Sequence, residues 1–189
     1  MTATTQTQST VVNGIDTQAL KGVIEQVSAD PAKGMTSWHV TSRWQGGARI
    51  DHTMETVKIG GQSVPRDFTL RTDEPLELCG TDEHANPQEY LMSAINACMM
   101  VGYSAVAALM GIKLTKLEVE LRGDIDLRGF LGIEESVANG YEGLRQTVHI
   151  AGDATDEQFE QLHQTVLATS PNYFNITKAI PTHSTMEIG

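Results

Sequence analysis

The sequence has few basic residues and an excess of acidic ones. Its 189 residues include 13 Lys and Arg against 24 Asp and Glu, which gives a formal net charge of -11. Proteins that bind nucleic acid need a basic surface, and anionic membranes attract basic segments. We therefore expect neither nucleic acid nor a membrane as a partner. The acidic residues are spread along the chain, which is typical of a solvated surface and not of an acidic tail.

Cysteine is also scarce, with only Cys79 and Cys98. Residues 1–13 are rich in Thr, Gln and Ser, and they lack the basic start and apolar run of a secretory signal. We therefore predict a disordered tail over residues 1–13 and a cytoplasmic protein, in which a structural disulfide is not expected. The remaining length fits one sizeable domain, predicted over residues 14–189.

Several common catalytic and binding motifs are absent. The sequence contains no phosphate-binding loop, dinucleotide fingerprint or Ser-His-Asp nucleophile elbow. Cys79 and His84 lie five residues apart with Asp82 and Glu83 between them, but a structural zinc site needs four ligands at recognisable spacings. The other five histidines form no pair at helical spacing. We expect no metal and no other cofactor.

The periodicity of apolar residues predicts a mixture of helices and antiparallel strands, which is an α+β fold. Leu20, Val23, Ile24 and Val27 follow helical spacing, so a helix should run from Asp16 or Thr17 to about Ser28. Trp38, Val40 and Trp44 alternate with polar residues, as in a half-buried strand. Further helices should begin at Asn86-Pro87, at Thr155 and at Ser170-Pro171, and further strands should cover about 49–59, the region of Phe68 and Leu70, 117–122, 144–150 and about 185–188.

One stretch, Tyr90 to Ile112, has no charged side chain and is long enough to span a bilayer. It is rich in Ala, Ser, Gly and Asn, however, and lacks the density of Leu, Ile and Phe that membrane insertion requires. A helix that is apolar on all sides is otherwise buried on all sides, which one small domain can hardly achieve. The stretch therefore predicts a homodimer in which a second copy covers the helix.

Cys98 lies within this apolar helix and is the most informative residue for function. A thiol reacts as its thiolate, and a free cysteine has a pKa of about 8.5, so catalysis needs a nearby cation and an access route. Free cysteine is also among the most buried residue types and often acts as a small hydrophobic side chain. Composition alone therefore favours a structural role for Cys98. A catalytic role needs the support of further motifs.

Such motifs are present on both sides of Cys98. The segment Asn86-Pro87-Gln88-Glu89-Tyr90-Leu91, followed by Cys98 and later by Ser170-Pro171, resembles the OsmC/Ohr family of thiol proteins. The resemblance extends from about Asn13 to Ile188. Three more segments resemble one branch of this family: Ala29-Asp30-Pro31, Asp73-Glu74-Pro75 and residues 123–133 (GDIDLRGFLGI).

The resemblance implies a swapped α+β fold, with antiparallel sheets packed on long central helices in an intertwined homodimer. It also implies two sites at the dimer interface. Active members of this family reduce organic hydroperoxides through a peroxidatic cysteine, an arginine, a glutamate and a resolving cysteine. The expected partners are therefore an organic hydroperoxide, or another small apolar molecule, and a dithiol reductant.

Cys98 matches the peroxidatic position of the family, whose oxidation product is a sulfenic acid. The family's arginine commonly follows a Gly-Gly turn in the first strands. Arg49 comes after Gly46-Gly47 and one further residue, and Arg43 is the alternative. Either arginine could equally be an ordinary surface residue.

The family's glutamate directly follows Asn-Pro, where this chain has Gln88 and then Glu89. Position 88 lies roughly 15 Å along the helix axis from Cys98, so the two side chains cannot touch within one straight helix. Glu89 should lie on the helix face opposite Cys98, as a first-turn carboxylate favoured by the helix dipole.

Ser170 occupies the place of the family's resolving cysteine, which implies a single-peroxidatic-cysteine branch. A hydroxyl cannot form a disulfide, so Ser170 is predicted to cap a helix. Cys79 could resolve the sulfenic acid only if its loop brings the two Cα atoms within roughly 7 Å.

The leading hypothesis is a thiol-dependent hydroperoxide reductase that acts through Cys98, with an external thiol or Cys79 resolving the oxidised sulfur. The departures at Gln88 and Ser170 keep a second hypothesis open. In that alternative the protein is a catalytically degenerate dimeric member that binds a small molecule, because a fold alone does not determine function.

Overall fold

The computed structural model of the protein describes residues 10–189 and divides into two compact units, Met1–Ser93 and Ala94–Gly189. The single domain over residues 14–189 stays a prediction. Most of the predicted disordered tail falls on residues 1–9, which lie outside the described residues. Its last part is ordered, because Val11–Val12 form strand β1, paired with β2 (Ile15–Asp16).

Helix α1 (Thr17–Ala29) follows β2 and is capped as its sequence predicts. The Asp16 carboxylate accepts hydrogen bonds from the backbone N–H groups of Gln18 and Ala19, at 2.9 and 3.1 Å. This cap satisfies two of the N–H groups that a helix start leaves unpaired. Asp30 ends α1 and caps the short 3-10 helix η1 (Pro31–Gly34).

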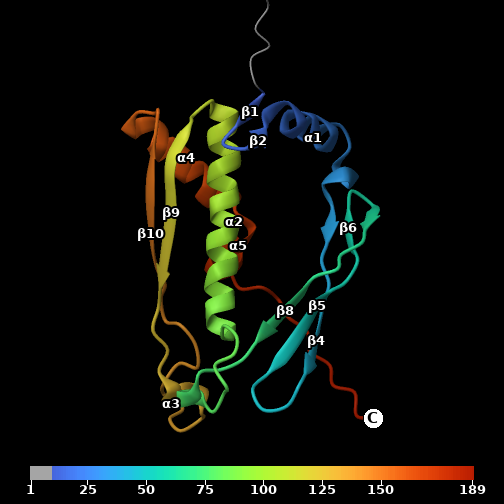
Figure 1. The fold of residues 1–189 in the computed structure, drawn as a ribbon, viewed down its shortest axis with the longest axis vertical. Coiled ribbons are helices and arrows are strands. Elements are labelled where there is room, and N and C mark those ends of the chain that lie inside the picture. The colour runs from blue at the N-terminus through green and yellow to red at the C-terminus, as the bar shows by residue number, and fades with distance from the viewer. Residues whose placement is uncertain (1–9) are drawn as a thin grey trace, which may run out of the picture. The chain divides into compact units, whose positions relative to one another are not determined.

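The strands of the first unit form two small antiparallel sheets (Figure 1). One has the order β4-β5-β8, and its strands are Val40–Trp44, Ile50–Met54 and Thr69–Thr72. The other has the order β3-β6-β7, and its strands are Thr36–Ser37, Val57–Ile59 and Gln62–Val64. The strand predicted over residues 49–59 is therefore two strands in different sheets. Gly60 and Gly61, both at positive φ, close the β6–β7 hairpin, which a Gly-Gly pair favours.

Few side chains of the first unit are buried, and Val57 is the only buried hydrophobic one among its described residues. Trp38, Val40 and Trp44 are 66%, 52% and 74% exposed. The prediction that these residues form a half-buried face is therefore wrong, since more than half of each side chain is exposed.

Helix α2 (Pro87–Met110) begins where the sequence predicts. Asn86 Oδ1 accepts from the Glu89 N–H at 2.9 Å, and Glu89 Oε2 accepts from the Asn86 N–H at 2.7 Å, which is a reciprocal cap. Gly111 ends the helix at φ 78°. By length and composition α2 could cross a membrane, a test that the core helix of a soluble protein also passes.

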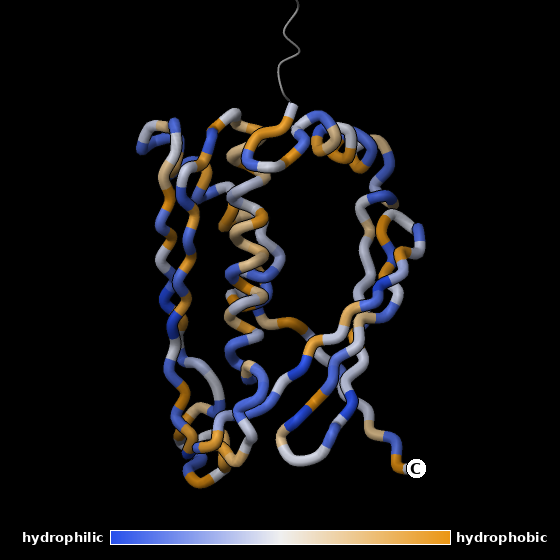
Figure 2. Tube along the Cα trace, in the orientation of Figure 1, coloured by the Kyte–Doolittle hydropathy of each residue, from blue (hydrophilic) through white to orange (hydrophobic). Residues whose placement is uncertain are grey.

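The second unit has a long two-stranded antiparallel sheet of β9 (Leu114–Arg122) and β10 (Arg145–Gly152). Hydrophobic and hydrophilic residues alternate along both strands (Figure 2), as expected for a sheet with one buried face. The connection between them contains the short helix α3 (Leu127–Phe130). Helices α4 (Asp156–Thr169) and α5 (Pro171–Thr177) follow.

The core of the second unit forms where α2 packs on α4. Met99, Tyr103 and Ala107 of α2 meet Leu162 and Val166 of α4, and all five are at most 1% exposed. The α+β fold class is confirmed, with α2 and α4 packed on the sheet residues Leu117, Val148 and Ile150. The strand predicted near 185–188 is wrong, since residues 178–189 form no regular element and Met186 and Ile188 are 83% and 87% exposed.

Candidate functional site

Cys98 lies in the middle of α2, half-buried, and contacts the side chain of Ser170. Its Sγ is 3.5 Å from Ser170 Oγ, and Ser170 is only 6% exposed. Ser170 Oγ also accepts a hydrogen bond from the Tyr173 N–H at 3.4 Å. Because the hydroxyl proton is not used in that bond, it is available for donation to the sulfur.

Ser170 has this position because it joins two helices. Its N–H donates to Val166 O at 2.9 Å and ends α4, while its side chain caps α5, whose first residue is Pro171. The prediction that Ser170 is a helix cap is confirmed. Asn172 Nδ2 donates to Ala94 O at 2.9 Å, one turn before Cys98, and so ties α5 to α2 beside the thiol.

Arg49 lies just before β5 and lines a cavity of about 250 Å³ in the first unit, together with Asp51, Arg71, Glu83 and His84. Arg49 Nη1 is 3.9 Å from Glu83 Oε2, a loose pair between two half-exposed side chains. Arg43 instead donates to Thr53 Oγ1 at 2.9 Å on a neighbouring strand. Arg49 is thus the arginine beside a cavity and a carboxylate, and sequence reasoning did not connect Glu83 with it.

The other predicted site residues lie at the start of α2 and in the loop before it. Gln88 is exposed in the first turn. Glu89 accepts from Asn86 in the reciprocal cap, so its carboxylate serves the helix start. Cys79 is exposed at φ 64°, just after the 3-10 helix η2 (Leu76–Leu78). A catalytic role for any of these three residues stays a prediction.

The loop that carries Cys79 and Glu83 is closed by a buried carboxylate, Asp73, which is 0% exposed. Asp73 Oδ2 accepts from the Thr81 hydroxyl at 2.5 Å and from the backbone N–H groups of Thr81 and Glu83 at 3.0 and 3.2 Å. The Thr81 hydroxyl, followed by these N–H groups and that of Glu74, lowers the pKa of Asp73 to about 2. Gly80 is required there, because a Cβ would overlap the backbone of Glu74.

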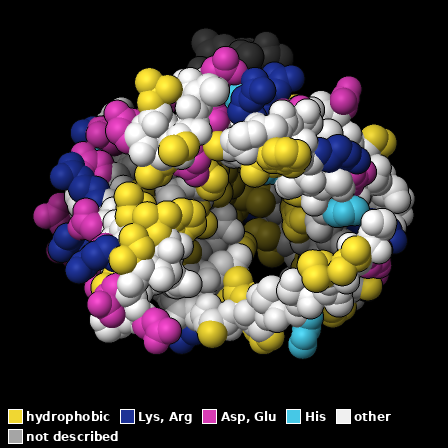
Figure 3. Space-filling model, turned by 90° about the horizontal axis from the view of Figure 1, so that it is seen from below, with side chains coloured by type: hydrophobic (Ala, Val, Ile, Leu, Met, Phe, Trp, Pro, Cys, Tyr) yellow, Lys and Arg dark blue, Asp and Glu magenta, His cyan; other side chains and the backbone are white. Residues whose placement is uncertain are grey.

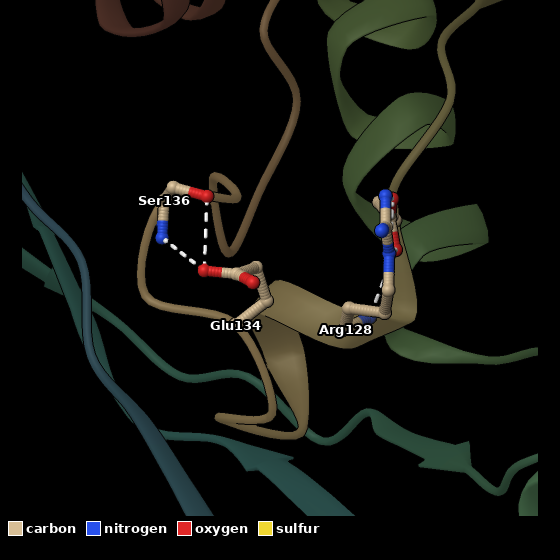
Figure 4. Close-up of polar contacts among 4 residues, drawn as sticks. Arg128, Glu134 and Ser136 are labelled. Carbon is tan, nitrogen blue, oxygen red and sulfur yellow. Dashed lines mark hydrogen bonds and ion pairs between the residues drawn. The ribbon is translucent and has the colours of Figure 1, made fainter.

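The connection between β9 and β10 contains the motif of residues 123–133 and is held by local polar contacts (Figure 4). Asp126 caps α3 and accepts from the Arg128 guanidinium, which lowers the pKa of Asp126 to about 2. Glu134 accepts from the N–H and hydroxyl of Ser136. At Gly129 a Cβ would overlap the carbonyl of Ala138, so only glycine fits at this position.

Within residues 10–189 no group of three or more His, Cys, Asp or Glu side chains is arranged to hold a metal ion. The candidate reactive groups are of two kinds. The second unit has the half-buried thiol of Cys98 beside the Ser170 hydroxyl, and the first unit has the guanidinium of Arg49 beside the Glu83 carboxylate. The fold and these groups define an α+β protein with a candidate reactive thiol on its long helix.

Comparisons with known proteins assign the family. The model of the OsmC-like protein family matches residues 80–185, more than half of the chain, and the protein belongs to this family. Its structure is similar to that of an OsmC-like protein from Mycoplasma pneumoniae, with 16% identity, a TM-score of 0.55, and 75% of this chain and 87% of that chain covered. It is also similar to an organic hydroperoxide resistance protein from Elizabethkingia anophelis, with 20% identity, a TM-score of 0.52, and 77% and 91% covered. No curated protein matches the chain.

The buried Asp73 carboxylate should make this loop sensitive to acid. Its pKa of about 2 in the folded protein lies below the value of about 3.9 for an unfolded aspartate. The stabilisation is therefore complete above about pH 4 and is lost as the pH falls through about 2. Asp73→Asn should destabilise the protein at pH 7 and should flatten the fall in the free energy of unfolding between about pH 4 and pH 2.

Urea unfolding at several pH values measures this effect. Asp67→Asn, at an exposed position, is the matched control. An unchanged pH dependence in Asp73→Asn would show that the depressed carboxylate does not stabilise the loop.

Proposed function

We propose that the protein reduces organic hydroperoxides, with Cys98 as the peroxidatic thiol and an external dithiol as the reductant. The observation that carries this proposal is the contact between Cys98 Sγ and Ser170 Oγ at 3.5 Å. In this proposal Cys98 and Ser170 stand at the family's two redox positions, with a hydroxyl at the second. Further support comes from the fold, which is similar to that of a hydroperoxide resistance protein.

The proposed reaction has two stages. The Cys98 thiolate attacks the terminal oxygen of the hydroperoxide, the O–O bond breaks, and the alcohol leaves with a proton. The sulfur is oxidised to a sulfenic acid. One thiol of the reductant then attacks that sulfur and releases water, and its second thiol displaces Cys98 to regenerate the reduced protein.

Ser170 determines how the second stage must proceed. A neighbouring cysteine would condense with the sulfenic acid within the chain, whereas a hydroxyl cannot form a disulfide. In our proposal the Ser170 hydroxyl donates to the thiolate before oxidation and leaves the sulfenic acid open to an external thiol afterwards. Cys79 is the alternative resolving thiol, in an exposed turn.

We also propose that Arg49 supplies the cation for this chemistry and that Glu83 replaces the glutamate missing at Gln88. The support is the position of Arg49 beside a cavity, with Glu83 Oε2 at 3.9 Å from its guanidinium. A guanidinium near the reacting oxygens would stabilise the negative charge that develops on the leaving alkoxide.

We also propose that the protein forms a homodimer. Monomers rarely expose large contiguous apolar patches, yet Trp38, Val40, Trp44 and Phe68 of the first unit are all more than half exposed. Figure 3 shows hydrophobic side chains at several places on the face in view. A second copy of the chain would bury them.

Turnover of cumene hydroperoxide with dithiothreitol tests the proposed activity. Cys98→Ser should lower the rate by more than about 100-fold, because the nucleophile is removed. Arg49→Ala should lower it by about 10- to 100-fold, and Arg43→Ala by less than about twofold. Equal rates for the wild-type protein and Cys98→Ser would refute the peroxidase and leave the binding protein as the better hypothesis.

Ser170→Cys should convert the protein to an internally resolved form. One equivalent of hydroperoxide should give a disulfide between Cys98 and the introduced thiol, since the present side-chain atoms are only 3.5 Å apart. The wild-type protein should instead retain a sulfenic acid that dimedone labels. Mass spectrometry without reductant distinguishes the two products, and Ser136→Cys, at an exposed loop position, should behave like the wild-type protein.

Sedimentation equilibrium of the full chain tests the dimer. A dimer is expected at micromolar concentration, and Trp38→Glu should weaken it by about tenfold or more, because buried tryptophans often dominate interfaces. Lys58→Glu, at an exposed position of β6, is the control. A wild-type monomer at these concentrations would overturn the proposal.

A further inference from the structure

A groove of about 500 Å³ lies in the second unit, where β10, α2 and α4 meet. Neither Cys98 nor Ser170 lines it, so the groove is separate from the thiol. Part of its wall is apolar and comes from Val148, Ile150 and Phe159, which also pack on the core. Its volume is in the range of pockets that hold small organic molecules.

Two polar side chains of the wall, Tyr103 and His163, are bonded to each other. The Tyr103 hydroxyl and His163 Nδ1 form a short hydrogen bond, and the two rings are stacked with centroids 6.0 Å apart. Burial, together with the negative charge of Glu160, raises the pKa of Tyr103 to about 12. The Tyr103 hydroxyl therefore keeps its proton near neutral pH, and its bond to Nδ1 joins the two side chains in the wall of the groove.

A third polar side chain, Gln146, carries a donor without an acceptor. Its Nε2 is buried and has no hydrogen-bond partner within residues 10–189, although the residue lines the groove. Buried donors are nearly always paired, so an unpaired one calls for an explanation. A ligand carbonyl in the groove could draw this amide toward it and accept the hydrogen bond.

The rim of the groove is acidic. Asp156 and Glu160 lie one helical turn apart on α4, both exposed, and neither forms an ion pair with a described residue. Two neighbouring carboxylates beside an apolar wall favour a cation over an anion. Gln164 Nε2 donates to Glu160 Oε1 at 2.9 Å and so restrains this carboxylate.

We infer that this groove is a binding site for an amphipathic organic ammonium ion that also carries a carbonyl, as in an N-acylated diamine. The apolar body lies against Val148, Ile150 and Phe159. The carbonyl accepts from Gln146, and the ammonium group lies between Asp156 and Glu160.

Isothermal titration with N-(4-aminobutyl)benzamide tests this inference, because the probe joins a phenyl ring, an amide carbonyl and an ammonium group. Wild-type protein should bind it with a dissociation constant of about 1 mM or tighter, as expected for a ligand of this size. Glu160→Gln should weaken binding by about fivefold or more. Gln146→Leu should weaken it by about threefold or more, with folding checked by circular dichroism.

The controls separate specific binding from general charge effects. Glu135→Gln changes the net charge equally at an exposed loop position and should leave the affinity unchanged. The carboxylate analogue 4-benzamidobutanoate should bind about tenfold more weakly than the amine. Equal losses in Glu160→Gln and Glu135→Gln, equal affinity for the two probes, or loss of binding in Cys98→Ser would each overturn the inference, whatever the result of the peroxidase assay.

Discussion

The packing of α2 on α4 is the constraint on which the candidate site depends. Met99 and Tyr103 of α2 meet Leu162 and Val166 of α4 in a core that excludes solvent. Burial of such side chains contributes roughly 1.5–3 kcal/mol each, so this contact can hold two helix segments that are distant in sequence. Cys98 precedes Met99, and Ser170 follows the last turn of α4. The distance between sulfur and hydroxyl is therefore a consequence of core packing, reinforced by the bond from Asn172 to Ala94.

Helix starts were predictable because they are set by capping hydrogen bonds between residues close in sequence. Asp16, Asn86 with Glu89, Thr155 with Gln158, and Ser170 with Pro171 all cap helices as their spacing predicts. These bonds join residues two or three positions apart, so the sequence alone contains the information. The Gly60-Gly61 hairpin was predictable for the same reason, since both residues adopt positive φ.

Contacts between distant residues were not predictable in this way. The contact between Cys98 and Ser170 joins positions 72 residues apart, and sequence spacing cannot supply its distance. The pairing of Arg49 with Glu83 likewise joins residues far apart in the sequence, one just before a strand and the other in a loop. The strand expected near 185–188 failed because alternation indicates a strand only where another strand is available to pair with it. The exposed Trp38 and Trp44 differ from their expected burial for a related reason, because an apolar strand face needs a covering layer.

If Ser170 stands in place of a second thiol, as we propose, the site makes different demands on its surroundings. An internal resolving thiol would act at short range and would not need the oxidised sulfur to be open to a second molecule. In the proposed reaction, with Ser170 in that place, the same sulfur meets first a hydroperoxide and then a reductant, both from solvent. A fully buried Cys98 could serve neither step, and a fully exposed one would lose the contact with Ser170. A half-buried thiol 3.5 Å from a 6%-exposed hydroxyl fits both demands of the proposed reaction.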